Sequence, residues 1–493
     1  METVRAIEFL CLEGNYGNIT AVCRRESAST CSGGSLDPPG QASSHPGINV
    51  TRPNSAAKKA GLLYFVFVMF AYTTGGPFGL EEMVTTSGPG MTLLYLLVIP
   101  LFWCIPVSLV AAELTTAIPV EGGFYRWVRA GFGNFWGFLA GWWNWSASWL
   151  LGASYAVLFS DYLAIYFPAL VGWKHYAVSV ALIALLAYIN IRGIQMVGIV
   201  ATILEFSVLV PILLLCVVAA LHWRYNPFHP FIPPHVPPFQ VFGVGLALGL
   251  WLYSGYEQCS SVAEEIDDPQ RSYPRALAIV VPLSIATYFL PAFFSLAALG
   301  NWSDWNVAYF STAARLIGGS WLGFVITIAA VLGDVSLLNA TVLTSTRMPS
   351  AMSEDGYLLP IFAAKHPKYG TPSMAILFSS AIYALLAFHT LAQLLTVYVW
   401  LRILVTIQTV LAAWRMRALR PDLLRPFRIP GGKLGLSYVV VAPLVMSVVA
   451  LIGSDKFALK WGPIPVALGV AAYFAFPKLK SLLDHSTKEN LSS

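Results

Sequence analysis

Charged residues are scarce in this chain. Asp, Glu, Lys and Arg make up 11% of the 493 residues, whereas 57% are hydrophobic and 14% aromatic. Soluble domains carry about a quarter charged residues, so this balance excludes an ordinary soluble fold. Stretches such as 206–221 and 372–388 contain no charge, and a soluble core could not bury so many of them. The composition predicts an all-α protein that crosses a membrane many times.

Motifs for metal binding, disulfide bonding and nucleotide hydrolysis are also missing. The six cysteines lack the paired spacing of a metal site or a disulfide framework. No Gly-x-x-x-x-Gly-Lys motif could hold the phosphates of ATP, and no nucleophile–base pair is visible. We therefore expect no enzyme, no cofactor and no nucleic-acid partner. Residues 1–57 have no long apolar run, which predicts a disordered tail rather than a cleaved signal peptide.

Apolar runs and the residues that interrupt them predict twelve membrane spans. The third run is long enough for a tilted helix. The spans divide the chain into a tail over 1–57, a membrane domain over 58–480 and a second tail over 481–493. The twelve runs lie at approximately 60–80, 91–118, 133–165, 174–191, 197–222, 240–262, 276–299, 319–345, 372–389, 391–414, 435–453 and 460–477.

The positions of Lys and Arg predict the orientation in the membrane. With the N-terminus in the cytoplasm, 23 of these residues lie on the cytoplasmic side and five outside, and Arg402 falls within a span. Cytoplasmic loops retain positive charge, so the opposite orientation would invert this ratio. We therefore expect both termini, and with them both tails, in the cytoplasm.

Two of the predicted spans contain residues that interrupt a helix. The first holds three glycines and a proline within 71–79, and the sixth reads Tyr-Ser-Gly-Tyr-Glu at 253–257. Each break alone could be a kink for packing. Their matched places, if the chain has two halves of five helices, favour a central binding site, because unwound backbone at membrane depth must face protein or a cavity.

Acidic residues within spans are the main candidates for chemistry, because burying a charge in a membrane is costly. Against them stands a single cation, Arg402, so the sequence predicts an uncompensated acidic interior that suits a cationic substrate or protons. Glu113 has a structural alternative as a partner of loop backbone, and Glu82 as a solvated group. Glu205 and Glu257 are the strongest candidates for proton coupling. The full set is Glu81, Glu82, Glu113, Glu205, Glu257 and Asp334.

The broken helices and nearby aromatic residues indicate what could bind. Exposed helix N-termini favour a carboxylate and freed carbonyls favour an ammonium, a combination that suits an amino acid. If the acidic side chains dominate instead, the site suits a polyamine. Aromatic faces bind alkylammonium groups, and Trp251 and Tyr253 lie beside the second break. The tryptophans at 142, 143, 145 and 149 are equally explained as interfacial or packing residues.

Six motifs in order carry a family resemblance, at 75–82, 113–127, 190–193, 264–275, 347–360 and 425–430. With them the chain resembles the amino acid–polyamine–organocation superfamily of transporters over about residues 58–480, in its polyamine-uptake and L-type amino acid branch. The resemblance implies a LeuT-type fold of two inverted five-helix repeats and two further C-terminal helices, with helices 1 and 6 discontinuous.

The resemblance also implies a set of site residues. The first break would receive a substrate carboxylate, helix 6 would face the substrate, and helix 3 would add two residues. Glu257 matches a position linked to protons, and Glu205 falls at or near a position where some proton-coupled relatives carry lysine. The implied substrate-binding residues are Thr74, Gly75, Gly76, Pro77, Phe78, Ser148, Tyr155, Trp251, Tyr253, Ser254, Gly255 and Glu257.

These observations predict a proton-coupled uptake carrier for amino acids or polyamines in the plasma membrane, with the substrate, protons and the lipid bilayer as its partners. Two alternatives stay open. One is an amino-acid exchanger, and the other is a nutrient-sensing receptor that retains the carrier fold but does not transport.

Overall fold

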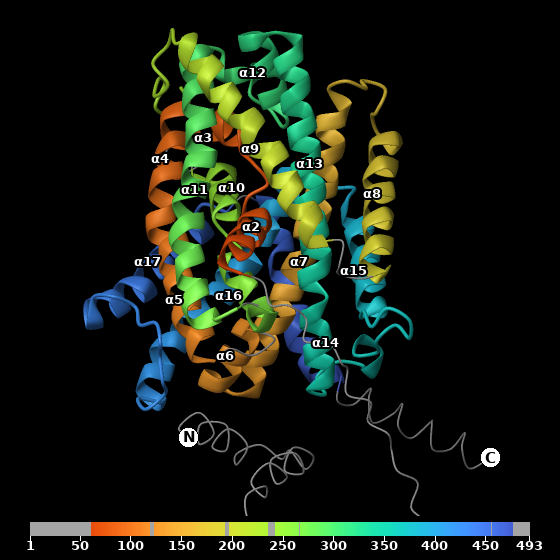
Figure 1. Cartoon of the computed structure of the whole chain (residues 1–493), viewed down its shortest axis with the longest axis vertical. Helices are drawn as coiled ribbons and strands as arrows, with labels where there is room; N and C mark the ends of the chain where they lie inside the picture. The colour runs from red at the N-terminus through yellow and green to blue at the C-terminus, as the bar shows by residue number, and fades with distance from the viewer. Residues whose placement is uncertain are drawn as a thin grey trace, which may run out of the picture. The chain divides into compact units, whose positions relative to one another are not determined.

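The computed structural model describes residues 61–118, 123–192, 197–234, 242–265, 267–454 and 456–476. All of them belong to one compact unit, Lys59–Ser493. The tails expected at 1–57 and 481–493 lie outside the described residues. In the described part every regular element is helical (Figure 1), so the predicted all-α class is confirmed there.

The helices follow one another with short connections. In chain order they are α2 (Leu62–Thr73), α3 (Glu81–Ser87), α4 (Pro89–Ile99), the π-helix η1 (Pro100–Cys104), α5 (Ile105–Ala117), α6 (Gly123–Phe132), α7 (Asn134–Ala164), α8 (Trp173–Arg192), α9 (Val197–Leu221), α10 (Val244–Leu252), the 3₁₀ helix η4 (Tyr256–Glu265), α11 (Pro269–Ala298), the 3₁₀ helix η5 (Trp302–Asp304), α12 (Tyr309–Gly318), α13 (Ser320–Ser345), α14 (Arg347–Glu354), the 3₁₀ helix η6 (Pro360–Phe362), α15 (Ser373–Leu386), α16 (Leu391–Leu419), α17 (Gly432–Ile452) and α18 (Lys456–Trp461).

Seven helical stretches of the described residues are long and apolar enough to cross a membrane, and two shorter apolar helices, Ser207–Leu221 and Ser373–Leu386, accompany them. This supports an integral membrane protein, while the number of twelve spans stays a prediction. The seven stretches are Pro89–Ala117, Trp173–Arg192, Pro269–Ala298, Ser320–Glu354, Leu391–Leu419, Gly432–Ile452 and Lys456–Phe476.

Two short helices, α2 and α10, lie among longer ones (Figure 1). Helix α2 contacts α9, α11 and α13, and α10 contacts α3 and α16. Residues 74–80 connect α2 to α3 without helical structure, and residues 253–255 connect α10 to η4 in the same way. These connections fall where the sequence predicts broken spans. That each pair of helices forms one discontinuous span stays a prediction.

Glycine is required at the two connections because the backbone there turns into the left-handed region. The φ angles are 98° at Gly76, 90° at Gly79 and 111° at Gly255, values that residues with a side chain rarely adopt. The clustering of glycine that marked these segments in the sequence therefore has a local backbone cause.

Helix α16 starts at a defined point because Thr390 and Gln393 form a capping box, in which each side chain bonds the other residue's backbone N–H. From there α16 packs against α7, α10 and α5 over its buried length. This packing places Arg402, in the middle of α16, beside the connection that follows α10.

Candidate central cavity

A small cavity lies where the two non-helical connections meet α7, α13 and α16. Its volume is about 30 Å³, which is room for about two water molecules. Its lining is mostly aromatic and small polar residues: Tyr72, Thr73, Gly75, Gly76, Phe78, Asn144, Ala147, Ser148, Leu151, Tyr155, Trp251, Leu252, Ser254, Gly255, Gln258, Tyr288, Leu337, Ser345, Tyr398 and Arg402.

Eight of the residues implied by the family resemblance line this one cavity. They are Gly75, Gly76, Phe78, Ser148, Tyr155, Trp251, Ser254 and Gly255. The four others are not part of the lining. Thr74 bonds Ser284 through their hydroxyls at 2.8 Å, and the Tyr253 hydroxyl donates to the Leu96 carbonyl at 2.8 Å. Pro77 is absent from the lining, and Glu257 forms an ion pair behind it.

Aromatic rings close one side of the cavity. The rings of Tyr155 and Trp251 lie 6.2 Å apart between centroids. Trp251 packs so closely on Gly79 that a Cβ there would lie 2.9 Å from the indole. The tryptophans of α7 behave as packing residues: Trp142, Trp145 and Trp149 contact one another edge to face. Tyr155 and Trp251 therefore line the cavity, whereas these three tryptophans of α7 do not.

An ion pair between Glu257 and Arg402 changes the electrostatic character of the site. Both side chains are 3% exposed. Arg402 also donates to the Asn144 side-chain oxygen at 2.9 Å, and Asn144 is in turn hydrogen-bonded to Gln258. The expectation of an uncompensated acidic interior is therefore wrong at Glu257, because Arg402 from α16 neutralises it.

The other proton-coupling candidate, Glu205, lies within α9, but its side chain is outside the described residues.

Three residues that line the cavity, Arg402, Asn144 and Gln258, were not predicted from the sequence as part of the site. The one signal for Arg402 was its position as the single cation within a predicted span.

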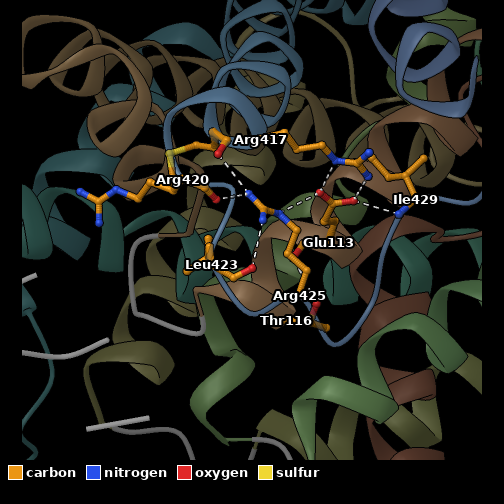
Figure 2. A network of polar contacts seen from close by, with 8 residues as sticks. Glu113, Thr116, Arg417, Arg420, Leu423, Arg425 and Ile429 are labelled. Carbon is orange, nitrogen blue, oxygen red and sulfur yellow. Dashed lines mark hydrogen bonds and ion pairs between the residues drawn. The ribbon is translucent and has the colours of Figure 1, made fainter. Parts of the chain in front are cut away.

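A second polar network surrounds Glu113 at the end of α5 (Figure 2). The Glu113 side chain is 1% exposed and forms ion pairs with Arg417 and with Arg425, the latter at 3.4 Å. It also accepts a hydrogen bond from the Ile429 backbone N–H at 2.8 Å. The structural role foreseen for Glu113 as a partner of loop backbone is thus observed, together with two arginines that the sequence did not connect to it.

Arg425 organises the loop that follows α16. Its guanidinium donates to the carbonyls of Leu423 at 3.0 Å, Met416 at 3.0 Å and Arg420 at 3.1 Å. Partial burial is the main cause that lowers the pKa of Arg425, and the neighbouring Glu113 carboxylate acts in the opposite direction. The network therefore ties α5 to the end of α16 and to the loop over 420–431.

We expect Glu113→Gln to lower stability, because it leaves two arginines facing a neutral amide. Breaking a fully buried pair costs roughly 3–5 kcal/mol, and the partial solvent contact of Arg417 reduces this to about 2–3 kcal/mol. The measurement is the melting temperature of the purified protein in detergent. Glu354→Gln, at an exposed residue of α14, is the matched control. Equal melting temperatures of the two variants would contradict this role.

Comparison with known proteins identifies the family. A sequence model described as "Amino acid permease" matches residues 64–473, which is nearly the whole described part. The chain belongs to the amino acid permease family. The expected superfamily is confirmed, and with it an integral membrane protein of a permease family rather than an enzyme.

Among its relatives, this permease is similar to a probable polyamine transporter of Arabidopsis thaliana, at 34% identity over 436 residues that cover 86% of this chain and 88% of that protein. It is 31% identical to the polyamine transporter PUT1 of Oryza sativa subsp. japonica over 448 residues, covering 89% and 82%. An uncharacterized transporter of Mycobacterium tuberculosis is 30% identical over 340 residues, covering 68% and 74%.

Proposed function

We propose that this permease carries amino acids or polyamines into the cell across the plasma membrane, coupled to protons and by alternating access. The observation that carries the proposal is the cavity formed where two non-helical connections meet. Backbone freed from helices, aromatic faces and small hydroxyl groups converge there. Relatives named as polyamine transporters support the substrate class.

The proposed architecture has twelve spans with both termini in the cytoplasm. Helices α2 and α3 would together form span 1, and α10 with η4 span 6, in the two inverted repeats of a LeuT-type fold. In such folds the substrate binds at the interrupted helices. Helices α6 and α14, which carry Arg126, Arg129 and Arg347, lie at the opposite end of Figure 1 from α3 and α12. We place the α6 end in the cytoplasm.

The small size of the cavity supports alternating access. A volume of about 30 Å³ holds no amino acid or diamine, so the surrounding helices must move before a substrate can enter. Trp251, Tyr155 and Phe78 line the cavity, and two of them also pack on residues outside it, Phe78 on Phe310 of α12 and Trp251 on Gly79, so we propose these rings as a gate. A bound amine would contact their faces, an interaction of roughly 0.5–2 kcal/mol.

The Glu257–Arg402 pair offers a way to couple transport to protons. Protonation of Glu257 would remove the charge that holds Arg402 and would favour a second arrangement of α16 and η4. We expect Glu257→Gln to abolish the pH dependence of uptake, because the amide has no proton to exchange. Uptake is measured at acidic and neutral external pH, with Glu354→Gln as control. Unchanged pH dependence in Glu257→Gln would remove Glu257 from this role and leave Glu205 as the candidate.

The direct test of the proposed function is radiolabelled uptake by the full chain in proteoliposomes. A panel of arginine, leucine, putrescine and spermidine separates amino acids from polyamines. A proton gradient imposed across the vesicles should increase the uptake of at least one of them. Absence of uptake for the whole panel, from protein with a cooperative melting transition, would overturn the proposal.

A further inference from the structure

The lining of the central cavity contains a cation and no acidic side chain. Among the described residues that line the cavity, Arg402 is the one that carries a charge. Its partner Glu257 is not part of this lining, and both side chains are 3% exposed. A substrate in the cavity therefore meets a guanidinium, whereas the carboxylate that pairs with it lies outside the lining.

The Arg402 guanidinium does not use all of its donors. Its Nη1 donates to the Asn144 Oδ1 at 2.9 Å, and its Nη2 forms the ion pair with Glu257. Its Nε is buried without a hydrogen-bond partner, and no other side-chain nitrogen or oxygen of the described lining residues is buried in this way. A buried donor without an acceptor is unfavourable, so this N–H favours a ligand that brings an acceptor into the cavity.

The polar side chains nearest to the guanidinium are already bonded to other groups of the protein. The Asn144 Oδ1 accepts from the guanidinium and also from the Gln258 amide. The Ser254 hydroxyl donates to the Leu250 carbonyl at 2.6 Å and accepts from the Trp103 indole at 3.0 Å. The Nε–H is therefore the charged donor that is left for a ligand.

A carboxylate matches this donor. Hydrogen bonds between a guanidinium and a carboxylate are charge-assisted and about twice as strong as neutral ones. The planar guanidinium holds its N–H groups in a fixed fork, so it can bind the carboxylate of a ligand through Nε while it keeps its protein partners on the other nitrogens. A protonated amine has no acceptor to offer, and its positive charge would lie beside that of the guanidinium. The cavity therefore favours a ligand that carries a carboxylate.

The rest of the lining suits the other parts of an amino acid. The Tyr155 and Trp251 rings, 6.2 Å apart between centroids, both line the cavity, and aromatic faces attract an ammonium group. The first connection offers a competing place for the carboxylate through its backbone N–H groups. One of these is already used, because the Gly79 N–H donates to the Glu81 carboxylate at 2.7 Å.

We propose that Arg402 binds the carboxylate of an amino-acid substrate through its Nε–H, and that this bond makes the permease select amino acids over polyamines and other amines that lack a carboxylate. The inference rests on the proposed function, and it names which of the two proposed substrate classes the cavity takes. It assigns the carboxylate to a side chain of α16 rather than to the first connection.

The test uses two pairs of ligands in which the amine is the amino acid without its carboxylate: leucine with 3-methylbutylamine, and ornithine with putrescine. Dissociation constants for the full purified protein in detergent are measured by titration calorimetry. The main variant is Arg402→Met/Glu257→Gln, which removes the guanidinium and leaves no unpaired carboxylate behind. Glu257→Gln alone retains the Arg402 Nε–H. Arg315→Met, at an exposed arginine of α12, is the matched control.

We expect the unmodified protein to bind each amino acid about tenfold or more tightly than its amine, which one charge-assisted hydrogen bond can supply. In the double variant this ratio should fall below about threefold, whereas Glu257→Gln and Arg315→Met should keep it near its original value. An unchanged ratio in the double variant would overturn the assignment, because groups such as the N–H groups of the first connection would then hold the carboxylate. A ratio that falls as far in Glu257→Gln would overturn it as well.

Arg402→Lys keeps the inference testable if the double variant has no cooperative melting transition. Lysine retains the charge that pairs with Glu257, but its single ammonium lacks the fork that holds a protein partner and a ligand on separate nitrogens. The ratio should therefore fall at least about threefold in Arg402→Lys. An unchanged ratio in this variant would count against a role of Nε.

The two proposals fail in different ways. If the unmodified protein binds none of the four ligands and transports none of the panel, the proposed function fails before any variant is compared. If it binds the amines as tightly as the amino acids, the proposed function stands for polyamines and only the role of Arg402 in selecting a carboxylate fails.

Discussion

Arg402→Met is expected to abolish uptake and to lower stability by roughly 3–5 kcal/mol, which is the cost of leaving one partner of a buried ion pair alone. Glu257 would then be a buried carboxylate beside the cavity, with its side chain 3% exposed. Asn144 would also lose the 2.9 Å hydrogen bond that fixes its amide. Both the thermal stability and the geometry of η4 at the cavity depend on this one side chain.

The informative control is the double variant Arg402→Met/Glu257→Gln. With both charges removed, no unpaired carboxylate is left buried at residue 257. The melting temperature should therefore return most of the way to that of the unmodified protein. Uptake should stay low in the double variant if the pair takes part in the transport cycle. A single Arg402→Met variant that melts like the unmodified protein would show that Glu257 does not depend on Arg402 as the structure indicates.

The sequence predicted well those features that depend on local residues. Glycines at 75, 76, 79 and 255 marked the two connections, because the positive φ angles at three of these positions are a local property of the backbone. The ordered motifs predicted the permease family over most of the chain, and the family match confirms it. Long apolar runs likewise predicted membrane helices.

Ion pairs between residues that are far apart in the sequence could not be predicted from local residue patterns. Glu257 and Arg402 are separated by 145 positions, and Glu113 and Arg417 by 304. The amino-acid sequence gives the number and positions of the charged residues, but it does not show which of them form ion pairs in the folded protein. For this reason the sequence favoured Glu205 and Glu257 as the acidic groups of the interior, although Arg402 pairs with Glu257 and, among the described residues, Glu81 and Asp334 have no Lys or Arg partner. The prediction of a cationic substrate therefore loses the support of an unpaired Glu257.

Gly333→Ala is expected to reduce uptake about tenfold or more, although it adds only one methyl group. The new Cβ would meet the carbonyl oxygen of Gly75 in the connection between α2 and α3, and a backbone atom cannot turn aside as a side chain can. Helix α13 would have to move away from this connection, which would displace Leu337 at the cavity. Initial uptake rates in proteoliposomes, normalised to protein amount, measure the effect.

Gly131→Ala is the matched control, because it makes the same change within helix α6. The nearest atoms to its new Cβ belong to Ala412 at 3.5 Å, an ordinary van der Waals distance. Alanine also favours the helix over glycine by about 1 kcal/mol, so this variant should be as stable as the unmodified protein and as active. If Gly333→Ala retains the same uptake rate as Gly131→Ala, the close approach of α13 to the first connection is not needed during transport. Comparing the two changes therefore separates a general effect of added volume from the specific contact between Gly333 and Gly75, which positions α13 beside the cavity.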